Sequence, residues 1–395
     1  MKLLQINITA NWGSTGKIAE QIGLVAMKHG WESYVAYGRW ANPSQSHLIK
    51  VGNMMHSVLH YAEQRIFDNE GLCSSGPTKG LVKQIEKIQP DIIHLHNIHD
   101  HYLNYKILFE FLQEYNHPVV WTFHDCWAFT GHCFHFVTQQ CYRWKTGCYE
   151  CPLRNVSPQT LLDCSRQHWE LKKKYFGGCK NLTIIPVSKW MEDFVHESFL
   201  KDCNILTIHN GIDLNVFRPM ESTAKTQDVM NILGVASVWS TSKGLADFIK
   251  LRRLLPENYH ITLIGLSKTQ IRQLPEGIVG IERTNNVEEL VEYYNKADVF
   301  VNSTYEDSFP TVNLEALACG TPVITYRTGG SPEAIDERTG VVIEQCDVDG
   351  LADAIREMKS RPLSSSACRQ RAELLWNKDK CFEAYIDLYE RLVRL

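Results

Sequence analysis

The stretch Tyr305–Val323, YEDSFPTVNLEALACGTPV, decides the fold and the chemistry expected of this chain. It holds an acidic loop, a Phe-Pro turn, an apolar helical run from Asn313 to Ala318 and the Gly-Thr-Pro-Val start of a strand. Glu315 is expected near the start of that helix, where the N-terminal dipole keeps a carboxylate ionised. With Asp307 on the loop, it can accept hydrogen bonds from a ligand rich in hydroxyl groups. An ordinary loop-helix-strand connection is the alternative, because helix starts are enriched in acids.

Short apolar runs alternate with helical patterns along the whole chain, which predicts parallel sheets with crossover helices. Strands are predicted at Lys2–Thr9, Ser33–Tyr37, Asp91–His94, Val119–Phe123, Leu182–Val187, Met230–Ala236, Ile261–Ile264, Val279–Ile281, Val299–Asn302 and Val323–Thr325. Helices are predicted at Ile18–Met27, Tyr105–Leu112, Thr160–Tyr175, Leu245–Leu254, Val287–Asn295, Asn313–Ala318 and Leu351–Met358.

A polar segment without periodicity, Asn210–Gln227, divides the pattern into two halves and predicts a linker. The fold class is therefore α/β, with two doubly wound, Rossmann-like domains and a ligand in the cleft between them. The first domain is predicted at residues 1–205, with a Cys-rich insertion at 126–164, and the second at residues 206–375. The last segment, 376–395, contains an amphipathic helix that is expected to return to the first domain.

The charge balance and the N-terminal sequence exclude some classes of function. The 395 residues include 41 basic and 45 acidic side chains, so there is no electrostatic case for nucleic acid as a partner. No signal-peptide pattern is visible, and no apolar run approaches the ~20 residues of a membrane span. A cytoplasmic protein is expected.

Two loops carry residues suited to phosphate. Asn11–Ile18, NWGSTGKI, follows the first strand with glycines that let the backbone approach a ligand, and a helix start favours an anion. It fails the Walker A pattern, and a tight strand-helix turn is the alternative. Lys243 follows the strand Met230–Ala236 and can clamp a diphosphate, unless it is a solvated loop lysine.

Histidines end two strands of the first domain. HLHNIHDH, from His94 to His101, has spacings that resemble a metal site, but no nearby carboxylate or cysteine completes a convincing ligand set. These side chains can equally bind hydroxyl groups or phosphate. His124 and Asp125 directly follow the strand Val119–Phe123, at the end where α/β enzymes bind ligands, although a core histidine is the alternative.

Five of the 13 cysteines gather between Cys126 and Cys151. Without a secretion signal a disulfide framework is not expected, and a C-x-x-C pair with two further cysteines can supply a structural zinc site. The predicted ligands are Cys133, Cys141, Cys148 and Cys151, with His132 or Cys126 as replacements. The alternative is that these cysteines pack a long loop.

The acidic segment, Lys243-Gly244, the His124 strand end and IHNGID at Ile208–Asp213 together resemble the retaining glycosyltransferases of family 4, which have the GT-B architecture. The GSTGKI, HLHNIH and HDCW segments are similar to a branch found in bacterial capsule, O-antigen and exopolysaccharide synthesis. The resemblance implies that the second domain binds a nucleotide-diphosphate sugar and the first binds a saccharide acceptor, expected to be lipid-linked. It also implies transfer without a catalytic cofactor.

The resemblance assigns a role to each matching position. Glu315 would bind the nucleotide ribose and Asp307 the donor sugar, although Asp is shorter than the family's usual Glu. An arginine that normally accompanies the phosphate lysine is replaced by Val238. Together the predicted residues are His124, Lys243, Asp307 and Glu315 for catalysis, Gly13, Ser14, Thr15, Gly16, Phe309, Pro310, Thr311, Val312 and Asn313 for the donor, and His96 and His99 for the acceptor.

Two other functions use the same fold: a nucleotide-sugar epimerase or phosphorylase, and a non-catalytic, metal-binding scaffold of a polysaccharide assembly complex. A lipid-linked acceptor would also require peripheral contact with the inner face of the cell membrane. The run Lys172–Lys174, with Trp169, Tyr175 and Phe176, is the candidate contact, and a solvated helix face is its alternative.

Overall fold

The computed structural model describes residues 1–156, 158–220 and 228–394. Two compact units contain these residues. Unit 1 comprises Met1–Ile208 and the chain from Phe382 onward, and unit 2 comprises His209–Cys381. The predicted linker, Asn210–Gln227, begins inside unit 2 and ends in residues 221–227, which lie outside the described residues.

Unit 1 is built on a parallel sheet of seven strands in the order β3-β2-β1-β4-β5-β6-β7. Buried, β-branched residues fill its central strands, as expected for a parallel sheet covered on both faces. The register places Leu3 of β1 between Ser33 of β2 and Ile92 of β4. The strands are β1 Lys2–Asn7, β2 Glu32–Tyr37, β3 His47–Lys50, β4 Ile92–Leu95, β5 Val119–Phe123, β6 Leu182–Pro186 and β7 Asn204–Ile205.

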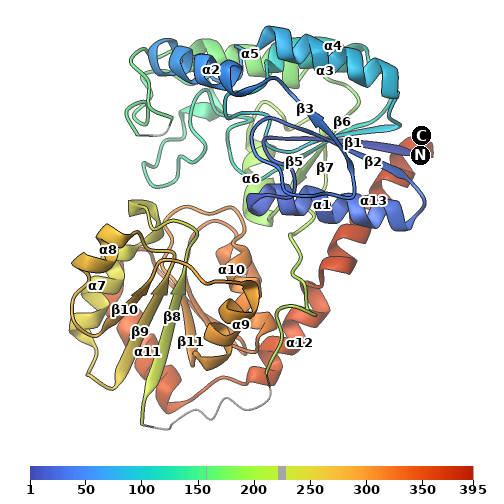
Figure 1. Ribbon diagram of the computed structural model, residues 1–395. Helices are drawn as coiled ribbons and strands as arrows, with labels where there is room; N and C mark the ends of the chain where they lie inside the picture. Colours follow the sequence, from blue (N-terminus) through green and yellow to red (C-terminus); the bar gives the residue numbers. More distant parts are fainter. Residues whose placement is uncertain (157, 221–227, 395) are drawn as a thin grey trace. The chain divides into compact units, whose positions relative to one another are not determined.

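Helices cover both faces of this sheet (Figure 1). One face carries α2 Met54–Phe67, α3 Ser75–Ile88, α4 Tyr105–Glu114 and α5 Ser165–Phe176, and the other carries α1 Gly13–Lys28 and the end of α13 Lys378–Arg394. Ile22 of α1 and Tyr389 of α13 share a core with Ile92 and Val120 of the sheet. The helix α6 Lys189–Glu197 and a short 3-10 turn, η1 Arg143–Lys145, complete the unit.

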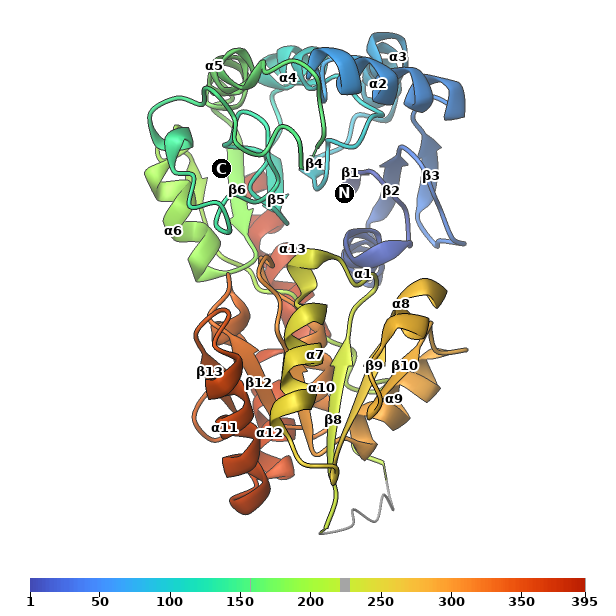
Figure 2. The ribbon, with the colours of Figure 1, turned by 90° about the vertical axis from the view of Figure 1, so that its left-hand side faces the viewer.

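Unit 2 has a parallel sheet of six strands in the order β10-β9-β8-β11-β12-β13. Figure 2 shows α7 and α11 along one face of that sheet, where Phe248 and Ile355 enter its core. The strands are β8 Met230–Val235, β9 Tyr259–Ile264, β10 Ile278–Ile281, β11 Val299–Asn302, β12 Val323–Tyr326 and β13 Gly340–Ile343. The helices are α7 Leu245–Leu254, α8 Lys268–Gln273, α9 Val287–Lys296, α10 Thr311–Ala318, α11 Val348–Ser360 and α12 Ser365–Leu375, with 3-10 turns η2 Thr241–Lys243 and η3 Ser331–Ala334.

The predicted α/β class with two doubly wound sheets is confirmed, while several elements were missed or misplaced. The predicted helix Thr160–Tyr175 begins only at Ser165, because Thr160 and Leu161 instead bond to the end of α2. The missed strands β3, β7 and β13 are short. The missed helix α2 buries its polar side, so its sequence lacks the usual inward apolar pattern.

Candidate active site

Each sheet has one point where the strand order reverses, and several of the predicted site residues lie on the loops beside it. In unit 1 this point is between β1 and β4, and in unit 2 it is between β8 and β11. In open α/β sheets the loops that leave the strands at such a point diverge and form the ligand site. The Gly13 and His96 segments follow β1 and β4, and the Lys243 and Asp307 segments follow β8 and β11.

The loops after β8 and β11 are in direct contact. The Tyr305 amide donates to the Ser242 carbonyl at 2.7 Å. Gly244 has φ +75°, and a Cβ there would lie 2.2 Å from the Ser303 carbonyl oxygen. Only glycine combines that conformation with so close an approach. The result is that Lys243 Nζ lies 2.9 Å from Asp307 Oδ2, with both side chains partly exposed.

A second glycine fixes the acidic loop from the other side. Gly329, at φ +52°, passes so close to Asp307 that an added Cβ would meet its carbonyl oxygen at 1.7 Å. The Gly330 amide then donates to the Ser308 carbonyl at 3.0 Å. The loop that carries Asp307 is therefore held between two glycine-dependent backbone contacts.

Glu315 lies in the second turn of α10 and not in its first turn, because the helix begins at Thr311 rather than at Asn313. The expectation that it sits beside the helix dipole is therefore wrong. Its orientation is set by Tyr294 of α9, whose hydroxyl donates to Glu315 Oε2 at 2.8 Å. Asp307 precedes this helix, so both predicted acids belong to the same edge of unit 2.

The other predicted donor residues differ in what they can offer. Pro310 precedes α10, and in the described chain no side chain caps the amides of Thr311 and Val312, which leaves them able to bind an anion. The Phe309 side chain is buried against His209 and Trp376. The Asn313 side chain is also buried, with its Oδ1 accepting from Asn302 Nδ2 at 2.9 Å, so it supports the site from inside.

In unit 1, Gly13 to Gly16 form the first turn of α1, which starts earlier than predicted. The Asn11 amide bonds to the Gly16 carbonyl at 3.2 Å, and a Cβ at Gly16 would meet Thr9 Oγ1 at 2.5 Å. Thr15 Oγ1 lies 3.3 Å from Asn7 Nδ2. These contacts bring the backbone of Gly13, Ser14 and Thr15 to the edge of the sheet.

His96 and His124 are brought together by their strands. His96 Nδ1 lies 3.1 Å from His124 Nε2, and His96 Nε2 lies 3.0 Å from Gln5 Oε1. Burial holds the pKa of His96 well below its usual value and lowers that of half-buried His124 to about 4, so both rings are neutral near pH 7. His94, by contrast, is a core residue bonded to Thr122 and Tyr389.

His99 is buried and charged. Burial alone would lower its pKa, but the carboxylates of Asp125 and Asp100 outweigh it and raise the pKa of His99 to about 10. His99 Nε2 lies 2.9 Å from Asp125 Oδ2. A hydroxyl-binding role for His99 would have to share this ring with Asp125, whereas His96 faces His124.

Sequence reasoning missed several residues at this edge. Glu70 Oε1 accepts the amides of Asp100 and His101, and its other oxygen binds His101 Nε2 at 2.7 Å, which shapes the histidine loop. Arg39 reaches His101 Nδ1 at 2.7 Å. Trp40 packs against Trp12 with ring centroids 4.8 Å apart, and both rings are nearly half exposed. Arg39 and Trp40 follow the strand Ser33–Tyr37, so the rule about strand ends could have found them.

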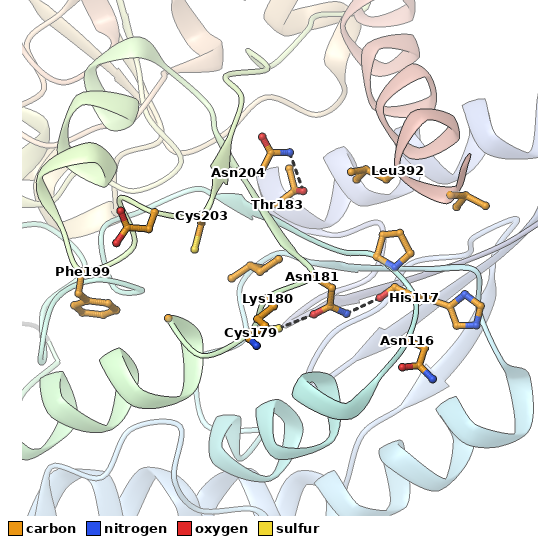
Figure 3. Close-up of a pocket in the computed structure, with 15 residues that line it drawn as sticks. Asn116, His117, Cys179, Lys180, Asn181, Thr183, Phe199, Cys203, Asn204 and Leu392 are labelled. Atoms are coloured by element: carbon orange, nitrogen blue, oxygen red, sulfur yellow. Dashed lines mark hydrogen bonds between the residues drawn. The ribbon is translucent and has the colours of Figure 1, made fainter. Parts of the chain in front are cut away.

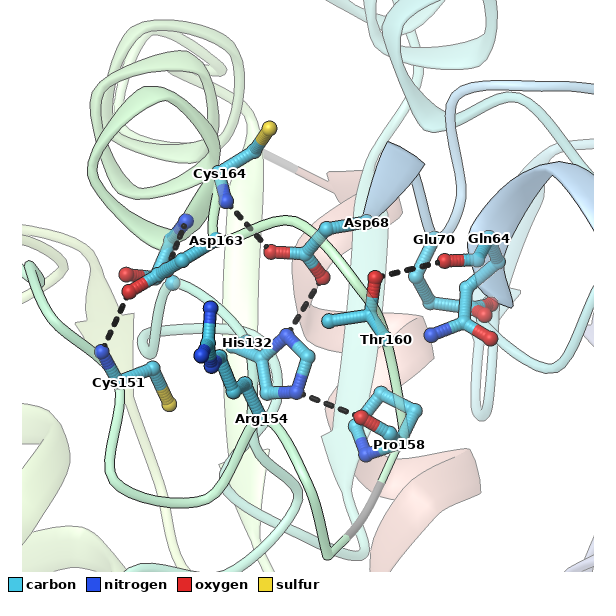
Figure 4. Close-up of polar contacts among 12 residues, drawn as sticks. Gln64, Asp68, Glu70, His132, Cys151, Arg154, Pro158, Thr160, Asp163 and Cys164 are labelled. Carbon is cyan, nitrogen blue, oxygen red and sulfur yellow. Dashed lines mark hydrogen bonds and ion pairs between the residues drawn. The ribbon is translucent and has the colours of Figure 1, made fainter. Parts of the chain in front are cut away.

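The Cys-rich segment is anchored mainly by carboxylates (Figure 4). Asp68 binds His132 Nδ1 at 2.6 Å and accepts the Cys164 amide, while Asp163 accepts the Cys151 amide. His132, offered as an alternative metal ligand, is thus used by Asp68 and by the Pro158 carbonyl.

The four predicted zinc ligands have not been brought into a metal-binding arrangement. Within the described ranges, no three His, Cys, Asp or Glu side chains are placed to hold a metal ion. Cys148 Sγ accepts the Gly131 amide at 3.1 Å, and burial raises the pKa of the Cys133 and Cys148 thiols. The zinc site formed by Cys133, Cys141, Cys148 and Cys151 therefore stays a prediction.

Two hollows elsewhere do not belong to this site. One, of about 670 Å³, lies in unit 1 beside Pro118, Leu182 and Asn204, near the beginnings of β5, β6 and β7 (Figure 3). The other, of about 600 Å³, lies in unit 2 beside Met230, Asp298 and Pro322. Both are at the amino ends of the strands, opposite the edges that hold the predicted residues.

Two family descriptions match the chain. Residues 19–216 match Glycosyltransferase Family 4, and residues 230–360 match Glycosyl transferases group 1. The first covers half of the sequence and contains the histidine and Cys-rich segments, and the second contains Lys243, Asp307 and Glu315.

Individual proteins agree with this result. A protein assigned to colanic acid biosynthesis as the glycosyl transferase WcaC of Escherichia coli (strain K12) is 25% identical, over 99% of this chain and 100% of its own length. The fold is similar to sucrose-phosphate synthase from Thermosynechococcus elongatus, at a TM-score of 0.73, 18% identity and 99% and 98% coverage of the two chains. It is also similar to Anabaena HepE in complex with UDP and glucose, at a TM-score of 0.67, 13% identity and 99% coverage of each chain. The chain belongs to glycosyltransferase family 4 and is a retaining glycosyltransferase of the GT-B fold.

Proposed function

We propose that this protein transfers a sugar from a nucleotide-diphosphate sugar to a hydroxyl group of a lipid-linked saccharide during surface polysaccharide synthesis. Unit 2 binds the nucleotide diphosphate of the donor, and unit 1 binds the acceptor. The observation that carries the donor assignment is the convergence of Lys243, Asp307 and the uncapped start of α10 at the strand-order reversal of unit 2.

The donor edge offers complementary groups for each part of a nucleotide sugar. Glu315, oriented by Tyr294, accepts hydrogen bonds from the ribose hydroxyls. The amides of Thr311 and Val312 and the Lys243 ammonium meet the diphosphate, where a helix start and a cation are both favourable. Asp307 binds hydroxyl groups of the transferred sugar while it keeps Lys243 in place.

The reaction requires one bond to break and one to form on the same face of the sugar. The bond from the anomeric carbon to the phosphate oxygen breaks, and the electron pair stays on the diphosphate. The acceptor oxygen bonds to the anomeric carbon, and its proton passes to the leaving phosphate oxygen. Lys243 and the α10 amides stabilise the charge that grows on that phosphate, which is usually the largest catalytic effect.

The acceptor edge of unit 1 suits a sugar. Neutral His96 and His124 can donate or accept a hydrogen bond, and the exposed Trp12–Trp40 pair offers flat apolar faces to the C–H groups of a ring. We assign His124 to the donor sugar and His96 to the acceptor, as the family resemblance implies. His99 is the second acceptor candidate, although Asp125 Oδ2 lies 2.9 Å from its Nε2 and Asp100 Oδ2 lies 3.6 Å from its Nδ1.

A UDP-sugar is the first donor to test. HepE, a structural neighbour, was solved with UDP and glucose, and that ligand set motivates the choice. The acceptor proposal draws on the colanic acid relative, which belongs to the synthesis of a polysaccharide. No described helix has the combined length and apolar character needed to cross a bilayer. A lipid-linked acceptor would therefore be reached by contact with the membrane surface.

The test is a binding screen of the purified chain against UDP-, GDP-, ADP- and dTDP-sugars, followed by transfer assays with membrane extracts that contain lipid-linked saccharides. We expect one donor to raise the melting temperature and its sugar to appear in the lipid fraction. An epimerised nucleotide sugar formed without any acceptor would instead favour an epimerase. No binding of any nucleotide sugar would overturn the proposal.

A further inference from the structure

Helix α2 of unit 1 buries its polar side and exposes its apolar side. Its buried residues are Ser57, His60 and Gln64, all polar. The outward side carries large apolar residues, and five of them are more than half exposed: Met54 at 70%, Met55 at 71%, Val58 at 57%, Leu59 at 56% and Phe67 at 52%. A surface helix of a globular protein normally buries its apolar side, so this side calls for an apolar partner.

Specific contacts fix α2 in this orientation. His60 uses both ring nitrogens, with Ser74 Oγ at 2.9 Å and the Gly71 amide at 3.2 Å. Gln64 donates to the Gln159 carbonyl at 3.2 Å. The Asn53 side chain accepts the His56 amide and caps the helix start. The polar side of α2 is therefore the bound side, and a simple rotation of the helix would break these bonds.

A pair of leucines extends the apolar surface at the end of the helix. The Leu161 amide donates to the Arg65 carbonyl and the Leu162 amide to the Ile66 carbonyl, at 2.9 and 3.3 Å. Both leucine side chains remain more than half exposed. The pair is thus pinned to the last turn of α2 by its backbone while its side chains point to solvent.

The neighbouring helix α3 adds positive charge. Leu81 and Ile85 are buried, and helical spacing places Lys79, Lys83 and Lys87 on the opposite, exposed side. Among the exposed positions of α3 there is one acid, Glu86. Figure 1 shows α2 and α3 in the same layer over the sheet of unit 1. The outward sides of this layer therefore combine apolar residues with a row of lysines.

We propose that this layer, the α2–α3 face, docks unit 1 on an anionic lipid bilayer. The face consists of Met54, Met55, Val58, Leu59, Ile66, Leu161 and Leu162, flanked by Lys79, Lys83 and Lys87. Apolar side chains enter the boundary between headgroups and acyl chains, and the lysines bind acidic headgroups. The inference rests on the proposed function, because a lipid-linked acceptor is presented at such a surface.

Charge favours a bilayer over a second copy of this chain. A two-fold contact through the apolar residues would leave the three lysines short of acidic partners, because Glu63 of α2 and Glu86 of α3 are the two exposed acids that the structure describes on these helices. A bilayer that contains acidic lipids complements the lysines and the apolar residues at once.

The face is also connected to the acceptor edge of unit 1. His60 and Tyr61 of α2 pack against His101, with ring centroids 5.5 and 5.3 Å away. His101 belongs to the loop that starts with His96 and is held by Glu70. Docking through α2 would therefore place the histidine loop close to the headgroup region, where the saccharide of a lipid-linked acceptor lies.

The candidate predicted from sequence, Lys172–Lys174 with three aromatic residues, keeps only Lys173 and Lys174 exposed. Lys172, Trp169, Tyr175 and Phe176 are all buried. Lys172 Nζ donates to the carbonyls of Trp127 and Thr130, and burial lowers its pKa to about 7. The side of α5 that carries these residues packs inside unit 1 and cannot contact a membrane.

Vesicle flotation of the full chain tests the proposal, with phosphatidylglycerol-phosphatidylcholine vesicles compared with phosphatidylcholine alone. The wild type should bind the anionic vesicles. The double variants Met55→Ser/Leu59→Ser and Lys79→Gln/Lys83→Gln should each lower the partition coefficient by roughly tenfold or more. The matched controls are Leu374→Ser, at a position 67% exposed in α12 of unit 2, and Lys268→Gln in α8. Both should bind like the wild type.

Nucleotide-sugar binding, measured by calorimetry on the same preparations, should be unchanged in all variants. Docking would be overturned if the wild type bound its donor but not the anionic vesicles, or if the α2 variant bound the vesicles as well as the wild type does. It would also be overturned if the wild type were a dimer that does not bind vesicles and the α2 variant were a monomer. If the proposed function were wrong, the result would be different, because the protein would bind vesicles but no nucleotide sugar.

Discussion

Lys243 and Asp307 form an ion pair, with Nζ 2.9 Å from Oδ2, although they belong to loops that follow different strands of unit 2. The cation proposed for the donor phosphate is therefore already bound to the acid proposed for the donor sugar. Because both side chains are partly exposed, the pair itself adds little stability. Its value lies in holding the ammonium group where a diphosphate would arrive.

Removal of the Lys243 charge should slow transfer much more than it destabilises the protein. We expect Lys243→Gln to lower kcat/KM by about two orders of magnitude, similar to the loss of one positioned electrostatic donor. Steady-state transfer and melting temperature are the measurements. Lys268→Gln, on an exposed position of α8, serves as the matched control. Equal activity of the two variants would show that Lys243 does not touch the reacting phosphate.

Substitutions of Glu315 and of Tyr294 should impair the enzyme to different extents. Glu315→Ala removes the proposed ribose acceptor and should lower kcat/KM by about two orders of magnitude. Tyr294→Phe keeps the carboxylate and removes the 2.8 Å bond that orients it, so donor KM should rise by less, on the order of fivefold. If Tyr294→Phe were as inactive as Glu315→Ala, Tyr294 would have a direct role rather than a positioning one.

Trp12 should affect the acceptor more than the donor. Its ring is nearly half exposed and lies against Trp40 at the start of α1. We expect Trp12→Ala to raise the acceptor KM about tenfold, since stacking contacts contribute ~1 kcal/mol each, and to change the dissociation constant of the nucleotide sugar by a much smaller factor. Tyr149→Ala, another half-exposed aromatic residue of unit 1, is the control. A loss of donor affinity as large as the rise in acceptor KM would contradict the assignment to the acceptor.

Buried neutral histidines should make unit 1 sensitive to acid. Burial holds the pKa of His94 well below its ordinary value of 6.5, so the unfolded chain takes up a proton below pH 6.5 while the folded chain does not. Stability from this group is therefore lost as pH falls below 6.5, with a slope of about 1.4 kcal/mol per pH unit.

The His94→Gln variant should lack the contribution of this one proton, so its slope of stability against pH should be smaller by about 1.4 kcal/mol per pH unit. Urea unfolding at several values between about pH 5 and 7 measures it. The variant is expected to be less stable at neutral pH, because Thr122 and Tyr389 lose their ring partner, so the slope and not the absolute stability is the readout. An unchanged slope would mean that His94 takes up a proton in the folded state.

The cysteines should matter for stability and not for transfer. Cys133 is buried, so Cys133→Ser places a hydroxyl group in an apolar surrounding and should cost about 1–3 kcal/mol. Activity per folded molecule should stay at the wild-type level. Exposed Cys346→Ser is the control for stability and should leave it unchanged. Zinc analysis of the same preparations decides between simple packing and the predicted metal site, since only the latter gives stoichiometric zinc that Cys133→Ser loses.

The parts of the molecule that follow local rules could be predicted from sequence. β5 and β11 match their predicted limits, because runs such as Val119–Phe123 are apolar, β-branched and bounded by breakers. The placement of Lys243 and Asp307 at one edge followed from the rule that ligands bind where parallel strands end.

What could not be predicted depends on contacts between distant residues. The helix start at Thr311 moved Glu315 into the second turn, and helix boundaries are the least certain part of such a prediction. Glu70 shapes the histidine loop from a segment 30 residues away, and nothing in its own neighbourhood in sequence marks it. The inverted helix α2 shows the same limit, since His60 and Gln64 become buried only through Ser74, Gly71 and Gln159.

Gly244 and Gly329 have an evolutionary consequence. The loop that carries Asp307 is shaped by the backbone approaches of these two glycines and by the side chains at its two ends, since Tyr305 bonds to Asp247 and Phe309 is buried. The partly exposed residues 306 and 307 can therefore change identity while the loop keeps its path, and a relative could acquire preference for another sugar through substitutions there. Replacement of either glycine would instead reshape the whole edge. We therefore expect relatives with different donor sugars to differ in the side chains of this loop and to keep both glycines.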